Sequence, residues 1–271
     1  MQVELAQIPV QDGVTEPNLA KILDTIPKAD TAGGTELLVF PELAMCGFPT
    51  LENIAGVAQT LDGPGIAAVR DAARRKGVAV TVGFAETAGG KYYNTSVLVD
   101  ARGDIVMSYR KTHSWASDVG VFTPGDDLVT AEWNGVRVGI LICFDIEFPE
   151  TARALASLGA DLLIVTNGNM DPYGPVHAKC IAARTLENQV FAVMCNRCGA
   201  GDGGLTFPGE SGILDPFGEI VAGAGKEETL VKGRIDWSLL DASRRDYRYT
   251  TQRRVPLVLD EGAAPGCAAI R

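Results

Sequence analysis

The chain has 271 residues and a formal net charge of −10, from 24 Lys and Arg against 34 Asp and Glu. Apolar residues make up 46% and charged residues 21%, a composition typical of folded globular chains, which excludes general disorder. The acidic balance, with no run rich in Lys or Arg, argues against a nucleic-acid partner. We predict one domain over residues 1–259 and a C-terminal tail over 260–271.

The N-terminal segment and the cysteines predict a cytoplasmic protein. The first residues lack a basic start followed by an apolar run, and no stretch approaches about eighteen apolar residues, so we expect no membrane span. Six cysteines are too few for a disulfide scaffold in a chain of this size, and reduced thiols fit that compartment.

Apolar β-like runs alternate with helical stretches along the chain. The predicted strands are Val3–Ile8, Glu36–Phe40, Val78–Gly83, Thr95–Val99, Ile105–Tyr109, Asp127–Trp133, Val136–Cys143, Leu162–Thr166, Phe191–Cys195 and Ser211–Leu214. The predicted helices are Pro17–Thr25, Pro64–Lys76, Pro149–Leu158 and Val176–Gln189. Three of these helices open on proline, which suits a first helical turn.

The dipeptide Asn134-Gly135 is the strongest short hairpin signal in the chain, because both residues tolerate the positive φ of a type I′ turn. Further turns at Asp100–Asp104 and Asp215–Glu219 also join β-like runs, so a mixed sheet is favoured over a parallel one. Two such sheets packed together with helices outside would accommodate this order of elements.

Cys143 closes the run Val136–Cys143 and leads into a helix that starts near Pro149. Unpaired N–H groups at a helix start favour a thiolate there and offer donors to an oxyanion, so Cys143 is a candidate nucleophile. The alternative is a small buried side chain that ends a core strand.

Glu42 and Lys111 also follow strand-like runs. Glu42 comes directly after Phe40-Pro41, where apolar neighbours would raise its pKa toward that of a general base. The cation of Lys111 could stabilise a developing oxyanion. Taken singly, each also fits a solvated surface position.

The chain has only two histidines, His113 and His177, and no Gly-x-Ser-x-Gly elbow, so neither a serine triad nor a His-rich metal site has support. If Cys143 is a nucleophile, a carboxylate is the better candidate for its base.

Taken together, three segments resemble the nitrilase superfamily of carbon–nitrogen hydrolases. They are Phe40-Pro-Glu42, Tyr109-Arg-Lys111-Thr-His113 and Ile142-Cys143-Phe-Asp-Ile-Glu-Phe-Pro149-Glu150. The resemblance spans roughly residues 2 to 240 and extends to Phe122-Thr-Pro-Gly125, Arg184-Thr-Leu-Glu-Asn188 and Asp215-Pro-Phe-Gly218. It implies an α/β fold, a four-layer α-β-β-α sandwich with two mixed β-sheets.

The resemblance also implies a catalytic trio of Glu42, Lys111 and Cys143, with no cofactor and no metal. Cys143 would form a thioester with a small carboxamide, while Lys111 and the backbone N–H of Phe144 hold the oxyanions. Where the family often has a second glutamate, seven residues after the lysine, this chain has Asp118, which is one methylene shorter.

Within the superfamily, Asn167–Tyr173 and Cys195–Gly199 look most like members that hydrolyse simple aliphatic carboxamides. Nitrile and N-carbamoyl amino acid hydrolysis use the same trio and stay open as alternatives. Glu147, Asn169 and Tyr173 are candidate substrate-binding residues through their proximity in sequence to the motifs. Trp115, Tyr92 and Tyr93 fit either the pocket or general packing.

Two alternatives belong to other classes. His177-x-x-Cys180 followed by Cys195-x-x-Cys198 has the form of a zinc site, which would make the protein a metal-stapled binding module. An inactive binding protein is the other alternative, although all three catalytic residues are present.

The resemblance implies a homodimer through the helices Pro149–Leu158 and Val176–Gln189, with larger oligomers also possible. The tail 260–271 would then either wrap a neighbouring subunit at the oligomer interface or stay mobile.

Overall fold

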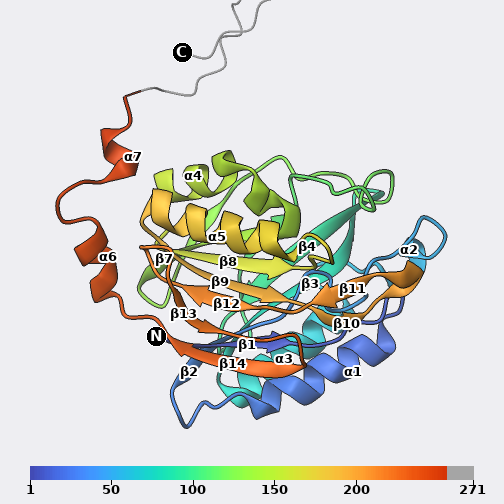
Figure 1. Cartoon of the computed structure of the whole chain (residues 1–271). Helices are drawn as coiled ribbons and strands as arrows, with labels where there is room; N and C mark the ends of the chain where they lie inside the picture. The colour runs from blue at the N-terminus through green and yellow to red at the C-terminus, as the bar shows by residue number, and fades with distance from the viewer. Residues whose placement is uncertain (255–271) are drawn as a thin grey trace, which may run out of the picture.

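Two six-stranded sheets form the centre of the protein in the computed structural model, which describes residues 1–254 (Figure 1). The first sheet has the order β14-β1-β2-β3-β4-β5. Its strands are β14 (Thr229–Arg234), β1 (Gln2–Gln7), β2 (Thr35–Val39), β3 (Ala79–Ala88), β4 (Lys91–Val99) and β5 (Ile105–Arg110). Strands β1, β2 and β3 are parallel, whereas β14, β4 and β5 each pair antiparallel with a neighbour.

The second sheet has the order β13-β12-β9-β8-β7-β6. Its strands are β13 (Ile220–Gly223), β12 (Gly212–Leu214), β9 (Phe191–Asn196), β8 (Leu162–Asn167), β7 (Val136–Ile142) and β6 (Thr130–Trp133). The central strands β7, β8 and β9 are parallel, and the outer strands pair antiparallel. A separate hairpin joins β10 (Cys198–Ala200) to β11 (Thr206–Pro208).

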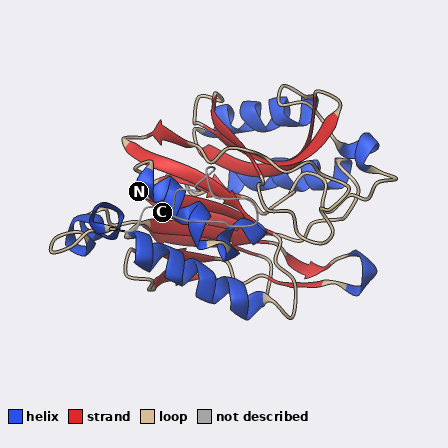
Figure 2. Ribbon diagram, turned by 90° about the horizontal axis from the view of Figure 1, so that it is seen from above, coloured by secondary structure: helices blue, strands red, loops and turns tan. Residues whose placement is uncertain are grey.

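Helices cover the outer faces of the two sheets. In Figure 1, α1 (Glu16–Thr25) and α3 (Pro64–Lys76) lie against the first sheet, and α4 (Pro149–Ser157) and α5 (Gly174–Asn188) lie against the second. Figure 2 shows the same helices flanking the strands from above. Shorter helices are α2 (Ile54–Val57), α6 (Ser238–Ser243), α7 (Tyr249–Gln252), η1 (Ile26–Lys28), η2 (Cys143–Glu147) and η3 (Asp202–Gly204). The predicted four-layer sandwich with two mixed sheets is confirmed.

Helix α3 illustrates how local sequence sets these elements. It begins at Pro64, whose fixed φ suits the first turn, and it ends where Gly77 takes a left-handed conformation with φ of 70°. Ile66, Val69 and Ala73 share one face and are buried, as their helical spacing requires.

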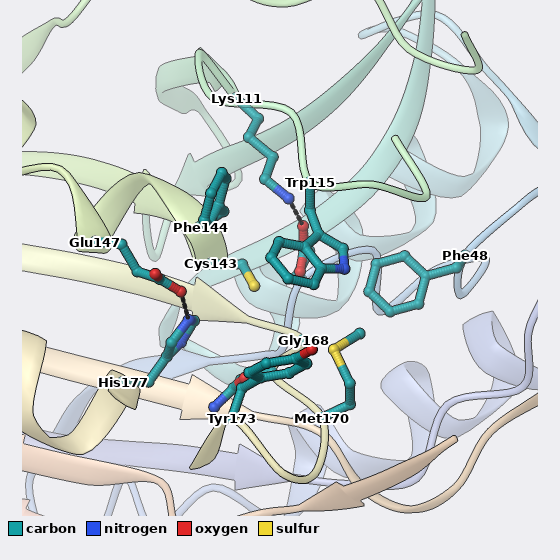
Figure 3. A pocket seen from close by; sticks show the side chains of 12 residues that line it. Phe48, Lys111, Trp115, Cys143, Phe144, Glu147, Gly168, Met170, Tyr173 and His177 are labelled. Atoms are coloured by element: carbon teal, nitrogen blue, oxygen red, sulfur yellow. Dashed lines mark hydrogen bonds and ion pairs between the residues drawn. The ribbon is translucent and has the colours of Figure 1, made fainter. Parts of the chain in front are cut away.

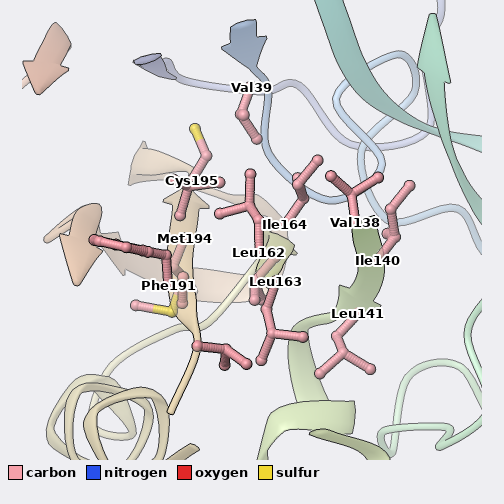
Figure 4. Packing of buried hydrophobic residues seen from close by; sticks show 14 of the residues in the cluster. Val39, Val138, Ile140, Leu141, Leu162, Leu163, Ile164, Phe191, Met194 and Cys195 are labelled. Carbon is pink, nitrogen blue, oxygen red and sulfur yellow. The ribbon is translucent and has the colours of Figure 1, made fainter. Parts of the chain in front are cut away.

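The largest core cluster lies between the two sheets. Val39 of β2 approaches Ile164 of β8, and the side chains of Val138, Ile140 and their neighbours fill the same layer (Figure 4). Strands β7, β8 and β9 read as almost continuous apolar runs because a parallel sheet covered on both faces has no solvated side.

The predicted long helices agree with the structure to within two residues at each end, and the hairpin at Asn134-Gly135 is confirmed by φ values of 49° and 78°. The differences lie in short segments. Strands β10, β11, β13 and β14 were not among the predicted strands, because their three to six residues carry glycine, proline or exposed side chains instead of a buried apolar run. Strand β4 begins at Lys91, four residues before the prediction, because Lys91 to Asn94 pair with the end of β3.

None of the helices between residues 1 and 254 combines the length and apolar character that crossing a membrane requires. The predicted tail 260–271, like the end of the predicted domain, lies outside the described residues.

Candidate active site

A pocket opens where β2, β5, β7 and β8 end, at the junction between the two sheets. Glu42, Lys111, Cys143 and Gly168 follow these four strands in that order, so each sheet contributes two of them. The full lining consists of Glu42, Phe48, Lys111, Trp115, Cys143, Phe144, Glu147, Gly168, Asn169, Met170, Tyr173 and His177. Placement at the carboxyl ends of strands is typical of sites in α/β folds.

The structure brings Glu42, Lys111 and Cys143 together in this pocket (Figure 3). Lys111 Nζ donates hydrogen bonds to Glu42 Oε1 at 2.7 Å and to Asp118 Oδ2 at 2.7 Å. All three of these charged side chains are almost completely buried. The shorter side chain of Asp118 therefore does reach the lysine.

Glu42 is fixed by its backbone and by a second side chain. Its N–H donates to Asn167 O at 3.2 Å, and Asn94 Nδ2 donates to Glu42 Oε1 at 2.8 Å. Leu43 follows with φ of 46°, and β3 approaches this turn so closely that a Cβ on Gly83 would lie 2.4 Å from Leu43 N. Because Oε1 accepts both side-chain hydrogen bonds, Oε2 is left buried without a partner among residues 1–254.

Burial raises the pKa of Glu42, and the negative charge of Asp118 adds to the effect. The cation of Lys111 and the hydrogen bond from Asn94 act in the opposite direction without cancelling the rise. This is the direction that the sequence predicted, and it suits a carboxylate that must accept a proton near neutral pH.

Burial on its own would lower the pKa of Lys111. The carboxylates of Glu42 and Asp118 outweigh burial and raise that pKa well above its ordinary value, so the side chain stays an ammonium. A fixed cation in a pocket that excludes water is suited to stabilise an oxyanion.

Cys143 lies at the turn from β7 into η2, with φ of 46°. The prediction that a helix start favours its thiolate is wrong. Burial, together with the negative charge of Glu42, raises the pKa of Cys143 well above 9.0, and the cation of Lys111 does not compensate. The resting residue is a thiol, because it is enclosed and faces a carboxylate.

Asp145, which is completely buried, ties the lysine segment to the cysteine turn. All hydrogen-bond donors to its carboxylate lie within two positions of Lys111 or Cys143 in the chain. They are Tyr109 Oη at 2.8 Å, Thr112 Oγ1 at 3.0 Å, His113 N at 3.0 Å and Ile142 N at 3.0 Å, with His113 Nδ1 also 3.0 Å away. Asp145 therefore sets the distance between the two segments.

The other predicted pocket residues, Phe144, Glu147, Asn169 and Tyr173, all line the cavity. The ring of Trp115 meets those of Phe144 and Tyr173 edge to face, with centroids 5.2 and 5.4 Å apart. Tyr92 and Tyr93 are not among the lining residues, and the Tyr93 ring instead packs under Arg110. The pocket wall thus combines aromatic rings with the polar side chains of Glu147, Asn169 and His177.

The four predicted zinc ligands do not form a metal site. His177 Nδ1 lies 3.1 Å from Asn167 Oδ1, and its Nε2 lies 3.1 Å from Glu147 Oε1. Cys195 belongs to the core between the sheets. Residues 1–254 contain no group of three His, Cys, Asp or Glu side chains placed to hold a metal ion, so the zinc interpretation is wrong.

Asn94, Asp145 and Phe48 were not predicted as site residues, and Gly168 and Met170 were noted only as part of the segment Asn167–Tyr173. Asp145 stands inside the cysteine motif, two residues after Cys143, and that position was a usable signal. Asn94 lies in β4 with no motif around it, and Phe48, Gly168 and Met170 lie in loops. Asn94 reaches Glu42 because β4 lies beside β3 in the first sheet, and the packing of the two sheets brings Phe48 into the same pocket as Gly168 and Met170.

A family model described as carbon-nitrogen hydrolase matches residues 2–245 of the chain. An (R)-stereoselective amidase from Pseudomonas sp. is 52% identical over 257 residues, which cover 95% of this chain and 93% of that protein. A nitrilase from Pyrococcus abyssi is 34% identical over 249 residues, which cover 89% of this chain and 93% of that protein.

Among solved structures, a variant of the amidase from Nesterenkonia sp. AN1 superposes with a TM-score of 0.83 at 27% identity. The match covers 94% of this chain and 96% of the other. That structure is described as showing Michael addition of acrylamide at the active site cysteine.

Replacing Gly168 by alanine should disable the pocket, because the added Cβ would lie 2.5 Å from Glu42 Oε2 and 2.8 Å from the Phe48 ring. We expect kcat for amide hydrolysis to fall at least about 100-fold, the scale of a misplaced catalytic group. Gly56→Ala is the control, since a Cβ there meets no atom within 4 Å. Equal activity of the Gly168→Ala and Gly56→Ala variants would contradict the placement of the active site in this pocket.

Asp145→Asn should misalign the lysine and cysteine segments. Both carboxylate oxygens of Asp145 accept hydrogen bonds, and in asparagine an N–H₂ group would replace one of these oxygens and face another donor. We expect a loss of about 1–3 kcal/mol in the free energy of unfolding, together with lower kcat. Denaturant unfolding and steady-state kinetics would measure both. Asp161→Asn, which breaks a partly exposed pair with Arg244, is the control and should leave kcat unchanged.

Proposed function

Because the chain belongs to the carbon–nitrogen hydrolase family, we propose that Cys143 is the nucleophile of an amidase, Glu42 its base and Lys111 its oxyanion-binding cation. The chain is an amidase that hydrolyses a small carboxamide to a carboxylic acid and ammonia. The observation that carries the residue assignment is the meeting of these three side chains in one buried pocket. An inactive binding role is disfavoured by the same arrangement.

In the acylation step, Glu42 accepts the thiol proton of Cys143, and the sulfur attacks the amide carbon. Glu42 Oε2 is the receiving atom, because Oε1 is already bonded to Lys111 and Asn94. The tetrahedral oxyanion is stabilised by Lys111 and by the backbone N–H of Phe144. The C–N bond then breaks, and Glu42 returns its proton to the leaving nitrogen, which departs as ammonia.

In the deacylation step, Glu42 takes a proton from water, and the hydroxide attacks the thioester carbon. The same two donors stabilise the second oxyanion. The C–S bond breaks, the acid departs and the proton returns from Glu42 to the sulfur. Apart from the amide and the water that are consumed, every group in these steps belongs to the chain.

We assign Asp118 to positioning. It anchors Lys111 Nζ at 2.7 Å opposite Glu42, and it accepts the backbone N–H of Trp115 at 2.8 Å. The second carboxylate keeps the lysine charged and raises the pKa of Glu42. Asp118 thereby takes the supporting role that the family often gives to a glutamate at this position.

For the substrate, the 52% identical relative supports an amide in preference to a nitrile, and it supports selectivity for the (R) enantiomer of a chiral amide. The nitrilase relative at 34% identity keeps nitriles as the second candidate. N-Carbamoyl amino acids fit poorly, because Lys111 is the sole Lys or Arg lining the described pocket and two carboxylates already pair with it.

We also propose a homodimer that packs through α4 and α5. Leu158, Val176 and Leu186 of this layer are 51%, 39% and 46% exposed, and such apolar side chains are available to a contact with a second copy. Larger assemblies would need further contacts. A cytoplasmic location remains part of the proposal, supported by the five free cysteines among residues 1–254.

Cys143→Ala should abolish ammonia release from short aliphatic amides. Hydroxylamine should trap the wild-type thioester as a hydroxamate, because the intermediate is an acyl donor. Cys180→Ala, a substitution of a partly exposed cysteine in α5, is the matched control and should retain activity. Turnover of nitriles but not amides would replace the amide assignment and keep the mechanism.

The pH profile should reflect Glu42. The carboxylate must be ionised to accept the thiol proton, and its pKa lies above the ordinary 4.5, so kcat/KM should fall as pH drops through a midpoint higher than 4.5. Burial lowers the pKa of His177 to about 4, so its titration should not add a second change in kcat/KM at pH values above the midpoint set by Glu42. A single acid limb centred at or below 4.5 would contradict a raised pKa at Glu42.

Leu186→Glu should disrupt the dimer, because it places a charge in the exposed apolar layer. Size-exclusion chromatography with light scattering should give twice 28.6 kDa for the wild type and 28.6 kDa for the variant. Leu51→Glu, at a position 65% exposed away from that layer, should leave the mass unchanged. A wild-type mass of 28.6 kDa would refute the dimer.

A further inference from the structure

The pocket contains a second polar centre that the hydrolysis mechanism does not use. Glu147 from η2 and His177 from α5 face each other with Oε1 and Nε2 3.1 Å apart. In Figure 3 this pair lies on one side of the Cys143 sulfur, and Phe48 and Met170 lie on the other. An acyl group bound at Cys143 therefore has one polar and one apolar side.

The charge of Glu147 has no matching cation in its surroundings. His177 is buried, and its lowered pKa of about 4 leaves it neutral near pH 7. Arg184 of α5 reaches only the backbone carbonyls of Ile146 and Glu147, and its charge pairs with Glu187 at 3.0 Å. Lys111 is held by Glu42 and Asp118.

Glu147 also has a free oxygen. Its Oε1 faces His177, while Oε2 accepts no hydrogen bond from residues 1–254. The side chain is 28% exposed, and it borders the cavity. A half-buried carboxylate with an open oxygen favours a ligand that brings a positive charge and N–H donors.

We propose that Glu147, held by His177, binds an ammonium or protonated amine on the acyl group of the substrate. This inference rests on the amidase function proposed above and specifies its substrate class as amides of amino acids or of other basic acids. A carboxylate at the same place in the acyl group would be repelled, so amides of dicarboxylic acids are excluded.

The subsite also provides a third point of attachment. The amide is held at Lys111 and Cys143, the ammonium at Glu147, and the remaining substituent meets the apolar side near Phe48 and Met170. Three different contacts around one carbon distinguish its two enantiomers. Glu147 thereby becomes a determinant of stereoselectivity as well as of charge preference.

The test compares isosteric amides. (R)-Alaninamide and isobutyramide differ by an ammonium in place of a methyl, and β-alaninamide and butyramide repeat the comparison with one more bond of reach. At pH 7 the wild type should show kcat/KM about tenfold or more higher for at least one amino amide than for its neutral partner. Glu147→Gln should reduce this ratio to about one, because it removes the negative charge that the ammonium meets.

Glu150→Gln, on the exposed first turn of α4, is the matched control and should keep the wild-type ratio. A wild-type ratio near one for both pairs, or a ratio that survives Glu147→Gln, would overturn the subsite and leave the amidase intact. If no amide is turned over, the proposed function fails instead. Calorimetric binding of (R)-alaninamide against isobutyramide to the wild type and Glu147→Gln would then decide the subsite separately.

Discussion

The site depends on a buried ammonium held between two buried carboxylates. Lys111 Nζ lies 2.7 Å from a carboxylate oxygen of both Glu42 and Asp118, and the side chains of all three are almost completely buried. A lone ion at this depth would be prohibitively costly, so each of these charges requires the others. Burial raises the pKa of both Glu42 and Cys143, and the cation of Lys111 offsets that rise only in part.

Such a cluster needs a rigid frame, and the junction of the two sheets supplies it. Polar contacts cross from one sheet to the other near the pocket: Tyr109 to Asp145 at 2.8 Å, Ser96 to Thr166 at 2.7 Å and Glu42 N to Asn167 O at 3.2 Å. The apolar layer behind them excludes water. Because strands and tight turns carry the reacting groups, their separation changes little during the reaction.

The sequence was sufficient for the parts of this arrangement that are local. Apolar runs and proline-led helices predicted the main elements, and the motifs around residues 42, 111 and 143 predicted which side chains would meet. It was insufficient where a property depends on packing. Asn94 reaches Glu42 only because β4 lies beside β3, and the pKa of Cys143 rises because the whole pocket encloses it, although its position at a helix start suggested the reverse.

The protonated state of Cys143 also bears on the durability of the enzyme. Peroxides and similar oxidants attack thiolates far faster than thiols, and they require access to the sulfur. A nucleophile that is enclosed, and that gives up its proton only to the neighbouring carboxylate, presents oxidants with a poor target between turnovers. The burial that delays ionisation therefore also preserves the sulfur in its reduced form.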